Sequence, residues 1–255
     1  MSPARHAQRL TVEQEPFLTV RSFASGCSSG YVIETHRHAW HQLVYACAGA
    51  MTVYGGIIHD DRPPGKAVFI PAGCTHSIRM WGNVAVRSLY FPESAALVFE
   101  ECRVLSVTPL LRELILRVVE CAALDSRIPS HQSLLNVLLD EMNIAPVAPL
   151  MLPLPEDARA LAVARHVLAC PTAAETLDEL ARRYGAGRRT LERLFSLETG
   201  LSFGLWRQKV RMLDSIRLLA EGKSVTEAAF DTGYASVSAF IAAFRHTFGC
   251  TPGRY

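Results

Sequence analysis

Four polar side chains in the first third of the sequence have the types and spacing of a ligand site: His36, His38, Gln42 and His76. Residues two apart on a strand point to the same face, so His36 and His38 project together, and His76 can join them inside a β-barrel. Three imidazoles can bind a divalent ion such as Zn, Ni, Cu or Fe. They can also hydrogen-bond to one another, to the backbone or to a small organic ligand. Gln42 is uncharged, so the sequence favours these hydrogen-bonded alternatives over a metal.

The segment that must position these side chains has a β pattern. Between residues 17 and 91, short runs rich in Val, Ile, Tyr and Phe alternate with Gly and Pro turns; examples are residues 30–34, 42–46, 51–54, 67–70 and 84–91. Many short strands at this spacing predict a small barrel or a double-sheet jelly roll. Trp40, Tyr45 and Trp81 are candidates for apolar pocket walls, although aromatic residues in a β domain are more often core.

Two glycine-bounded motifs surround the candidate site. The first is Gly30-x5-His36-x-His38-x3-Gln42-x6-Gly49, and the second is Gly65-x5-Pro71-x-Gly73-x2-His76. Both resemble the two motifs of the cupin superfamily, whose metalloenzymes place two His and a carboxylate in the first motif and one His in the second. Gln42 stands at the position of the carboxylate, and Met80 at the final polar position of the second motif. The resemblance therefore implies ligand sensing rather than catalysis, and no catalytic residue is predicted.

Residues 177–199 predict two short helices joined by a tight turn. Gly185 ends the first helix, and a second helix begins after Gly187. The second helix has an apolar face formed by Leu191, Leu194 and Phe195 and an opposite face formed by Arg188, Arg189, Glu192 and Arg193. This arrangement predicts a helix-turn-helix, whose second helix can enter a DNA major groove. A solvated charged helix in an unrelated helical domain has the same pattern.

The same architecture recurs near the end of the sequence. Ser224 and Glu227 have the spacing of a capping box, Gly233 ends the helix that follows, and Ser236 begins another helix with Phe240, Phe244 and Phe248 on its apolar face. Residues 202–220 between the two motifs predict a longer amphipathic helix with these residues inward: Leu205, Val210, Leu213, Ile216 and Leu219. A stiff connecting helix would let the two motifs read adjacent major grooves, which lie about 34 Å apart.

The C-terminal segment from about residue 156 resembles the DNA-binding domain of the AraC/XylS family of bacterial transcription regulators. The match is carried by LDELARRYGAGRRTLERLFSLETGLSF and by TEAAFDTGYASVSAFIAAFRHTFGCTPGRY. It covers roughly the last two-fifths of the chain and is far more specific than a short motif. Cupin-type sensors with histidine-rich motifs are also found in this family, so the resemblance implies a ligand-responsive regulator.

The resemblance implies DNA contacts by the exposed positions of the first recognition helix. We expect Arg189 and Arg193 to contact base edges, Glu192 to accept from a cytosine amino group, and Arg188 to anchor a phosphate, with Thr190 beside them. The second recognition helix offers small and mostly apolar groups, which suit thymine methyls: Ser236, Val237, Ser238, Ile241 and Ala242. Arg245 and His246 of the same helix are expected to contact phosphates. This difference predicts that the first helix contributes more to sequence specificity than the second.

These patterns predict an α+β fold of two domains. Residues 1–100 are expected to form the cupin-like sensor, and residues 101–143 a helical segment with helices at 110–124 and 131–142. Residues 144–156 hold four prolines and are the predicted linker. Residues 157–255 are the predicted DNA-binding domain with two helix-turn-helix motifs. In the family, helices such as those in 101–143 mediate dimerisation, although packing within the chain is the commoner use of an apolar stripe.

Charge and cysteine usage agree with this division. Residues 1–155 hold 12 Lys/Arg and 13 Asp/Glu, a net charge of −1, whereas residues 156–255 hold 14 and 11, a net charge of +3. The basic excess therefore lies on the predicted DNA-binding segment. The seven cysteines include no CxxC pair, the first residues resemble no signal peptide, and no run approaches the ~20 apolar residues of a membrane span. These features favour a reduced, cytoplasmic protein.

Three functions are compatible with the sequence. The leading one is a regulator that binds double-stranded DNA as a homodimer, responds to a small-molecule or metal effector and, if it is an activator, contacts RNA polymerase. The second is a cupin metalloenzyme with an accessory helical domain, which the missing carboxylate disfavours. The third is a constitutive DNA-binding protein whose barrel serves only dimerisation. An effector must bind one conformational state more tightly than the other to control DNA binding.

Overall fold

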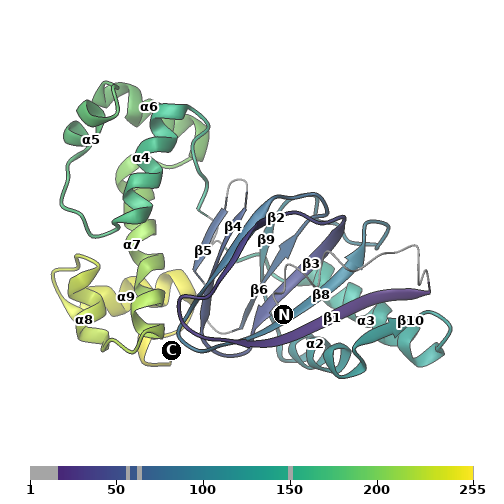
Figure 1. Cartoon of the computed structure of the whole chain (residues 1–255). Coiled ribbons are helices and arrows are strands. Elements are labelled where there is room, and N and C mark those ends of the chain that lie inside the picture. Colours follow the sequence, from purple (N-terminus) through teal and green to yellow (C-terminus); the bar gives the residue numbers. More distant parts are fainter. Residues whose placement is uncertain (1–16, 56–57, 62–64, 149–151, 255) are drawn as a thin grey trace. The chain divides into compact units, whose positions relative to one another are not determined.

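The computed structural model describes residues 17–55, 58–61, 65–148 and 152–254 (Figure 1). The chain divides into two compact units, one of residues 1–56 and 62–151 and the other of residues 57–61 and 152–255. Strands dominate the first unit and helices the second. The predicted α+β organisation, with a β-rich N-terminal part and a helical C-terminal part, is therefore confirmed.

Short antiparallel strands build the first unit. The larger sheet has the order β10-β1-β8-β3-β6-β9 and consists of β1 (Leu18–Cys27), β3 (Trp40–Ala46), β6 (Lys66–Ile70), β8 (Val84–Pro92), β9 (Arg103–Ser106) and β10 (Ala123–Asp125). A second sheet joins β2 (Val32–His36), β7 (His76–Trp81) and β4 (Ala50–Gly55) in that order. The described segment Ile58–Asp61 forms a further short strand, β5.

Alternation along β3 gives the larger sheet two different faces. Leu43 and Tyr45 lie in the core that the sheet shares with the helices of this unit. Gln42 points to the opposite face, where its side-chain oxygen is 3.2 Å from a ring nitrogen of His76 on the second sheet. The candidate site therefore lies between the two sheets. Tyr45, which the sequence suggested as a pocket wall, belongs instead to the helix-covered core, because it lies on the same face of β3 as Leu43 and on the face opposite to Gln42.

Two helices cover the larger sheet. Helix α2 (Pro109–Cys121) begins at the N-cap Thr108, whose hydroxyl accepts from Leu111 N, and α3 (Pro129–Ile144) follows. Their apolar stripes are buried in the same core as the sheet: Leu111, Ile115, Val118, Leu135, Leu138 and Met142. The main use of these stripes is therefore packing within the chain, since burying a Leu or Ile side chain contributes about 1.5–3 kcal/mol.

The segment 101–143 contains strands as well as the predicted helices. Strand β9 pairs with β6 at the edge of the larger sheet, and β10 pairs with β1. The helix predicted to reach residue 124 ends at Cys121, because Ala122 takes a positive φ of 61° and the chain then enters β10. Leu124 is fully buried there. Pairing with a strand a hundred residues away thus overrides the local helical pattern.

The proline-rich segment is held at both described ends. Ser106 N donates to Pro146 O and Ala148 N donates to Val104 O, each at 2.8 Å, so residues 146–148 pair with β9. On the other side, Trp206 Nε1 donates to Pro153 O at 2.7 Å. Residues 149–151 of the predicted linker lie outside the described residues.

The second unit consists of helices with defined caps. They are α4 (Ala158–Ala169), α5 (Leu177–Arg183), α6 (Arg188–Thr199), α7 (Phe203–Ala220), α8 (Val225–Asp231), α9 (Val237–Phe248) and the short 3-10 helix η2 (Pro252–Arg254). Capping boxes begin α5, through Thr176 and Glu179, and α8, through Ser224 and Glu227. Helices α5–α6 and α8–α9 are the two predicted helix-turn-helix motifs, and both are confirmed.

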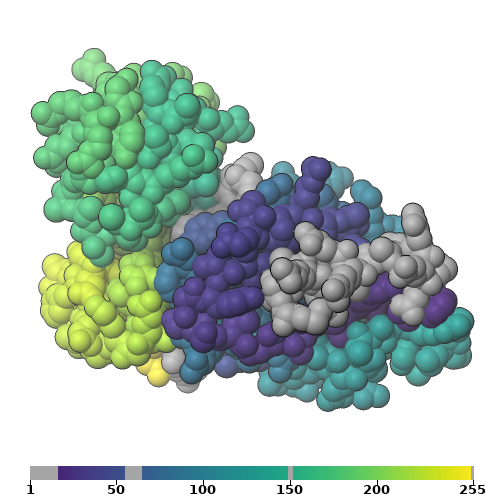
Figure 2. Space-filling model, in the orientation of Figure 1, coloured from purple at the N-terminus to yellow at the C-terminus, as the bar shows by residue number. Residues whose placement is uncertain are grey.

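Helix α7 connects the two motifs (Figure 1), and each motif forms its own lobe in the space-filling view, green for the first and yellow for the second (Figure 2). Val210, Leu213 and Ile216 are buried as predicted. Leu205 was predicted to face inward, but 57% of its surface is exposed. It lies in the first turn of α7, where Phe203 and Trp206 fill the core beside Phe195 instead.

We predict that Ser224→Ala destabilises the second motif by about 1 kcal/mol, because the N-cap hydroxyl is lost. The Ser224 hydroxyl accepts from Glu227 N, and the Glu227 carboxylate accepts from Ser224 N at 2.8 Å. The midpoint of urea unfolding checks this. Ser238→Ala is the matched control, since Ser238 is exposed on α9 and caps no helix. Equal midpoints for the two variants would contradict the capping role.

Candidate functional site

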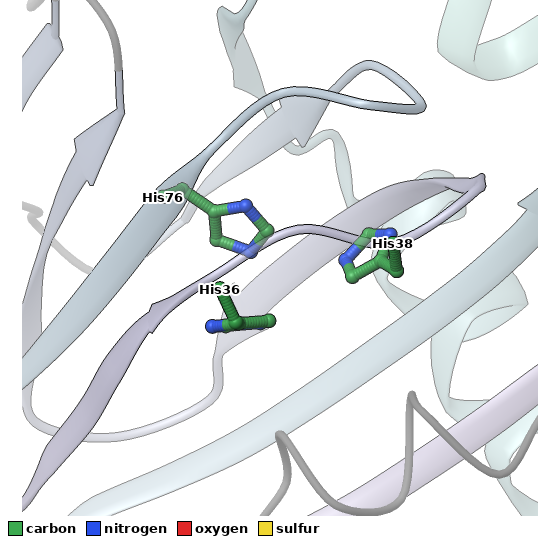
Figure 3. A group of neighbouring side chains, drawn as sticks. All are labelled: His36, His38 and His76. Carbon is green, nitrogen blue, oxygen red and sulfur yellow. The ribbon is translucent and has the colours of Figure 1, made fainter.

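Three histidines of the first unit converge between the two sheets (Figure 3). His36 ends β2, His38 lies in the connection to β3, and His76 begins β7. One ring nitrogen from each lies within 4.8 Å of the others. The ring centroids of His36 and His76 are 4.3 Å apart, and those of His38 and His76 are 5.1 Å apart. The three residues singled out from their spacing are therefore neighbours in the fold.

The tautomer of each ring follows from its surroundings. Each Nδ1 lies beside a backbone carbonyl oxygen: Glu34 O for His36 at 2.7 Å, Trp40 O for His38 at 2.8 Å and Cys74 O for His76 at 3.0 Å. A carbonyl oxygen only accepts, so each Nδ1 carries the proton and donates it. In a neutral ring the lone pair is then on Nε2. This is the arrangement that orients histidines which bind metals, because the second nitrogen fixes the ring.

Gln42 extends the cluster to a fourth polar group. Its Oε1 lies 3.2 Å from Nε2 of both His38 and His76. Its Nε2 donates to the hydroxyls of Ser88 at 3.1 Å and Tyr90 at 3.3 Å. All of these contacts are buried. Gln42 thus joins His38 and His76 to two hydroxyl groups of β8 in the larger sheet.

The contact between Gln42 Oε1 and the two imidazoles brings hydrogen-bond acceptors together. Two chemical states remove this conflict. The amide can turn over, so that its NH2 group donates to both Nε2 atoms and its oxygen accepts from the two hydroxyls. Alternatively, a cation can lie among the Nε2 lone pairs and Oε1, all of which are metal ligands of ordinary type. The site therefore suits either a metal ion or a hydrogen-bond network, which can include a small organic ligand.

Burial keeps His38, His76 and Tyr90 neutral. His76 is 1% exposed, and desolvation lowers its pKa to about 4. Burial also lowers the pKa of His38 and raises the pKa of Tyr90 to about 12. At neutral pH His38 and His76 are therefore uncharged imidazoles, the form that binds a metal ion without first losing a proton.

Sequence reasoning missed Ser88 and Tyr90. They are two residues apart on β8, so alternation places both on the face that carries Gln42, and this signal was present in the sequence. Of the aromatic residues suggested as pocket walls, Trp40 packs against Tyr90. Trp81 donates its Nε1 proton to the Thr52 hydroxyl at 2.7 Å.

The second candidate surface is the outer face of α6. Arg188, Arg189, Glu192 and Arg193 are all exposed there, as predicted. Arg188 donates to Glu192 Oε1 at 3.0 Å and to Asp178 Oδ2 at 2.9 Å. Within the described part of the chain, Arg189 and Arg193 have no hydrogen bond or ion pair. Thr190 is half-buried beside them. Two guanidinium groups are thus unengaged, and the third is held in place.

The outer face of α9 differs in chemistry. Ser238, Ala242 and Arg245 are exposed, whereas Val237 and Ile241 are half-buried. Ser236 is the N-cap, and its hydroxyl accepts from Ala239 N at 3.2 Å. A shallow open hollow on this face is lined by Ser238, Ile241, Ala242, Arg245, His246 and Thr251. Thr251 was not among the predicted residues. The face is mostly apolar at its centre, with its cationic groups toward the end of the helix.

Comparison with known proteins agrees with both units. A family described as an AraC-like ligand binding domain matches residues 21–139, and a helix-turn-helix domain family matches residues 180–255. The HTH-type transcriptional regulator NimR of Escherichia coli K12 is 33% identical over 220 residues, which are 86% of this chain and 81% of NimR. This chain belongs to the AraC family. It is a transcription regulator with a helix-turn-helix DNA-binding domain and an AraC-like ligand-binding domain.

Two further proteins match a smaller part of the chain or match it less closely. The HTH-type transcriptional regulator RipA of Corynebacterium glutamicum is 37% identical over 103 residues, which are 40% of this chain and 31% of RipA. The solved structure of ToxT from Vibrio cholerae covers 93% of this chain and 97% of its own, at 13% identity and a TM-score of 0.40. NimR and RipA are both named as transcriptional regulators, so the metalloenzyme alternative gains no support. Among the described residues, none of the helices is long and apolar enough to cross a membrane.

Proposed function

We propose that this AraC-family regulator binds a divalent first-row transition-metal ion through the Nε2 atoms of His36, His38 and His76, with Gln42 Oε1 as the fourth ligand, and that the ion controls DNA binding. The observation that supports this most strongly is the shared orientation of the rings. All three Nδ1 atoms face backbone carbonyls, which leaves three Nε2 lone pairs for one ligand. The alternative network, in which the Gln42 NH2 group donates to Nε2 of His38 and His76, uses only two of these lone pairs and gives no role to that of His36.

The donor set fits a sensor better than a permanent structural site. Three imidazoles and an amide oxygen suit Zn, Ni, Cu or Fe rather than Mg or Ca, which prefer oxygen ligands. None of the four groups is negatively charged, so the ion keeps its full charge in a buried place and is bound less tightly than beside a carboxylate. Moderate affinity lets a regulator exchange its ion with the surroundings. When bound, the ion would link the two sheets, because His36 and His76 belong to the second sheet and Gln42 to the larger one.

For the DNA-binding unit we propose unequal roles for the two recognition helices. Arg189 and Arg193 of α6 contact base edges, for which their unengaged guanidinium groups are suited. Arg188 anchors a phosphate and fixes Glu192 through their ion pair. On α9, Ser238 and Ala242 contact bases in the adjacent major groove, and Arg245 and His246 contact phosphates. The protein acts on DNA as a homodimer, and as an activator it would also contact RNA polymerase.

Titration of the purified full chain tests the metal site. After treatment with a chelator, the protein is titrated with Zn²⁺, Ni²⁺ and Co²⁺ against a fluorescent competitor. Mobility shift on DNA selected from genomic fragments follows, with and without the ion. We expect one ion per chain and a changed DNA affinity with the ion bound. His41→Asn is the matched control, since His41 lies on the opposite face of β3 and Asn can still accept from Ala72 N. Absence of specific binding by all three ions would overturn the proposal and favour an organic ligand.

A further inference from the structure

Two cysteine sulfurs of the first unit are in direct contact. Cys74 Sγ and Cys102 Sγ are 3.6 Å apart, although the residues are 28 positions apart in the sequence. Cys74 lies in the connection between β6 and β7, and Cys102 directly precedes β9. Pairing of β6 with β9, with Phe69 opposite Arg103, brings the two segments together. The contact thus follows from the sheet topology.

The two thiols differ in accessibility. Cys102 is 7% exposed, whereas Cys74 is only partly buried. A small solute from the solvent therefore reaches Cys74 first, with Cys102 behind it at contact distance. An accessible thiol backed by a second thiol is the arrangement of redox-sensor cysteines with a resolving partner. An S–S bond is about 2.05 Å long, so closure needs a further approach of roughly 1.6 Å.

We infer that Cys74 and Cys102 form a reversible redox site that a hydroperoxide converts to an intramolecular disulfide. The Cys74 thiol loses its proton and its sulfur attacks one peroxide oxygen; the O–O bond breaks, and the released hydroxide takes up that proton, which gives Cys74 sulfenic acid and one water. The Cys102 thiol then loses its proton and its sulfur attacks the Cys74 sulfur; the expelled hydroxide takes up this proton as a second water. In total two thiols and one H2O2 give one disulfide and two waters, with two electrons passing from sulfur to oxygen.

This redox site is attached to the histidine cluster. The Cys74 carbonyl oxygen accepts from His76 Nδ1, and Gly73 N donates to His38 O at 2.8 Å. Cys102 is continuous with β9, which four register pairs hold against β6. The movement that closes the disulfide therefore falls mainly on residues 71–75, the connection that orients two histidines. Oxidation is expected to change the metal affinity, and this consequence, unlike the disulfide itself, rests on the proposed function.

The disulfide is tested on the reduced full chain by graded H2O2, alkylation of the remaining thiols and mass spectrometry of unreduced peptides. We expect a peptide cross-linked through Cys74 and Cys102 at low peroxide excess, lost again with dithiothreitol. In Cys102→Ser the cross-link is absent and dimedone traps sulfenic acid on Cys74. Cys170→Ser removes an exposed thiol and is the control that keeps the cross-link. Alkylation of both Cys74 and Cys102 while Cys170 is oxidised would overturn the inference, as would cross-links only between chains.

Co²⁺ titration of the reduced and oxidised protein then separates the two claims. A cross-linked protein with a Co²⁺ affinity changed by about 10-fold or more supports the coupling to the histidines, because disturbing an outer-shell partner costs about 10- to 100-fold in metal affinity. A cross-linked protein with unchanged affinity overturns the coupling. If neither form binds Zn²⁺, Ni²⁺ or Co²⁺ but the cross-link is present, the metal proposal fails while the redox site stands.

Discussion

His76→Asn is expected to lower the affinity of the first unit for Zn²⁺ by more than about 100-fold, because even the loss of an outer-shell partner costs about 10- to 100-fold. Asn is chosen because its amide NH2 occupies the place of Nδ1–H and can still donate to the Cys74 carbonyl. Asn has no atom in the place of Nε2, so the substitution removes one metal ligand and keeps the hydrogen bond to the Cys74 carbonyl. Competition with a fluorescent chelator measures the affinity directly.

Controls must separate the loss of a ligand from the loss of the fold, since His76 is buried. The unfolding midpoint of the metal-free variant should lie close to that of the metal-free parent, whereas added Zn²⁺ should raise the midpoint of the parent only. The control variant His41→Asn should retain both effects. A Zn²⁺ affinity of His76→Asn within threefold of the parent would mean that this imidazole does not bind the ion.

Gln42→Glu should change the metal affinity in the opposite direction. A carboxylate at this position lies 3.2 Å from two imidazole nitrogens and adds the negative charge that the site lacks. We expect Zn²⁺ to bind about 10- to 100-fold more tightly, which corresponds to roughly 1.4–2.8 kcal/mol of binding free energy. This is a modest part of the Coulomb attraction between the ion and a carboxylate in direct contact. If the parent cluster were only a hydrogen-bond network, the parent protein would bind no Zn²⁺, and the same change would make the metal-free protein less stable.

Much of the second unit could be predicted because its signals are local. The capping box at Ser224 and the apolar spacing of α6 and α9 are set within a few residues, as is the box at Thr176, which was not predicted. The exposed arginines of α6 follow from the same helical period. Leu205 was predicted wrongly, because a position in the first turn of α7 can face solvent even where its spacing fits the apolar stripe.

The first unit was less predictable because distant pairs decide it. The histidines could be grouped from their motifs, but the tautomers depend on backbone carbonyls that only the fold supplies. Strands β9 and β10 and the break at Ala122 arise from pairing with β6 and β1. The contact of Cys74 with Cys102 has the same origin, and nothing in the spacing of the seven cysteines indicated it.

Arg189→Ala and Arg193→Ala are each expected to weaken binding to the cognate DNA site by about 1–3 kcal/mol, or roughly 5- to 150-fold. Both side chains project from α6 without a partner among the described residues, so the free protein loses no interaction when either is shortened. The cost therefore reports on DNA contacts rather than on stability. Mobility shift or anisotropy on cognate and scrambled DNA of equal length, at one fixed salt concentration, measures it.

Arg188→Ala is the informative comparison within the same helix. Arg188 is paired with Asp178 and Glu192 and is proposed to contact a phosphate. Its loss should therefore weaken binding to cognate and scrambled DNA alike, and reduce the slope of log affinity against log salt concentration by about one. Arg117→Ala removes the same charge from α2, where the arginine pairs with Glu120, and should leave DNA binding unchanged. These two variants separate base recognition from general electrostatic attraction.

The ratio of cognate to scrambled affinity decides between the two kinds of contact. If Arg189 and Arg193 contact bases, their loss lowers this ratio, whereas loss of a phosphate contact leaves it unchanged. The exposed groups in the first half of α9 are small, among them Ser238 and Ala242, so Ala242→Ser should change the ratio far less than either arginine variant. Equal losses on both DNAs for the arginine variants would assign them to phosphates and leave the specificity to α9.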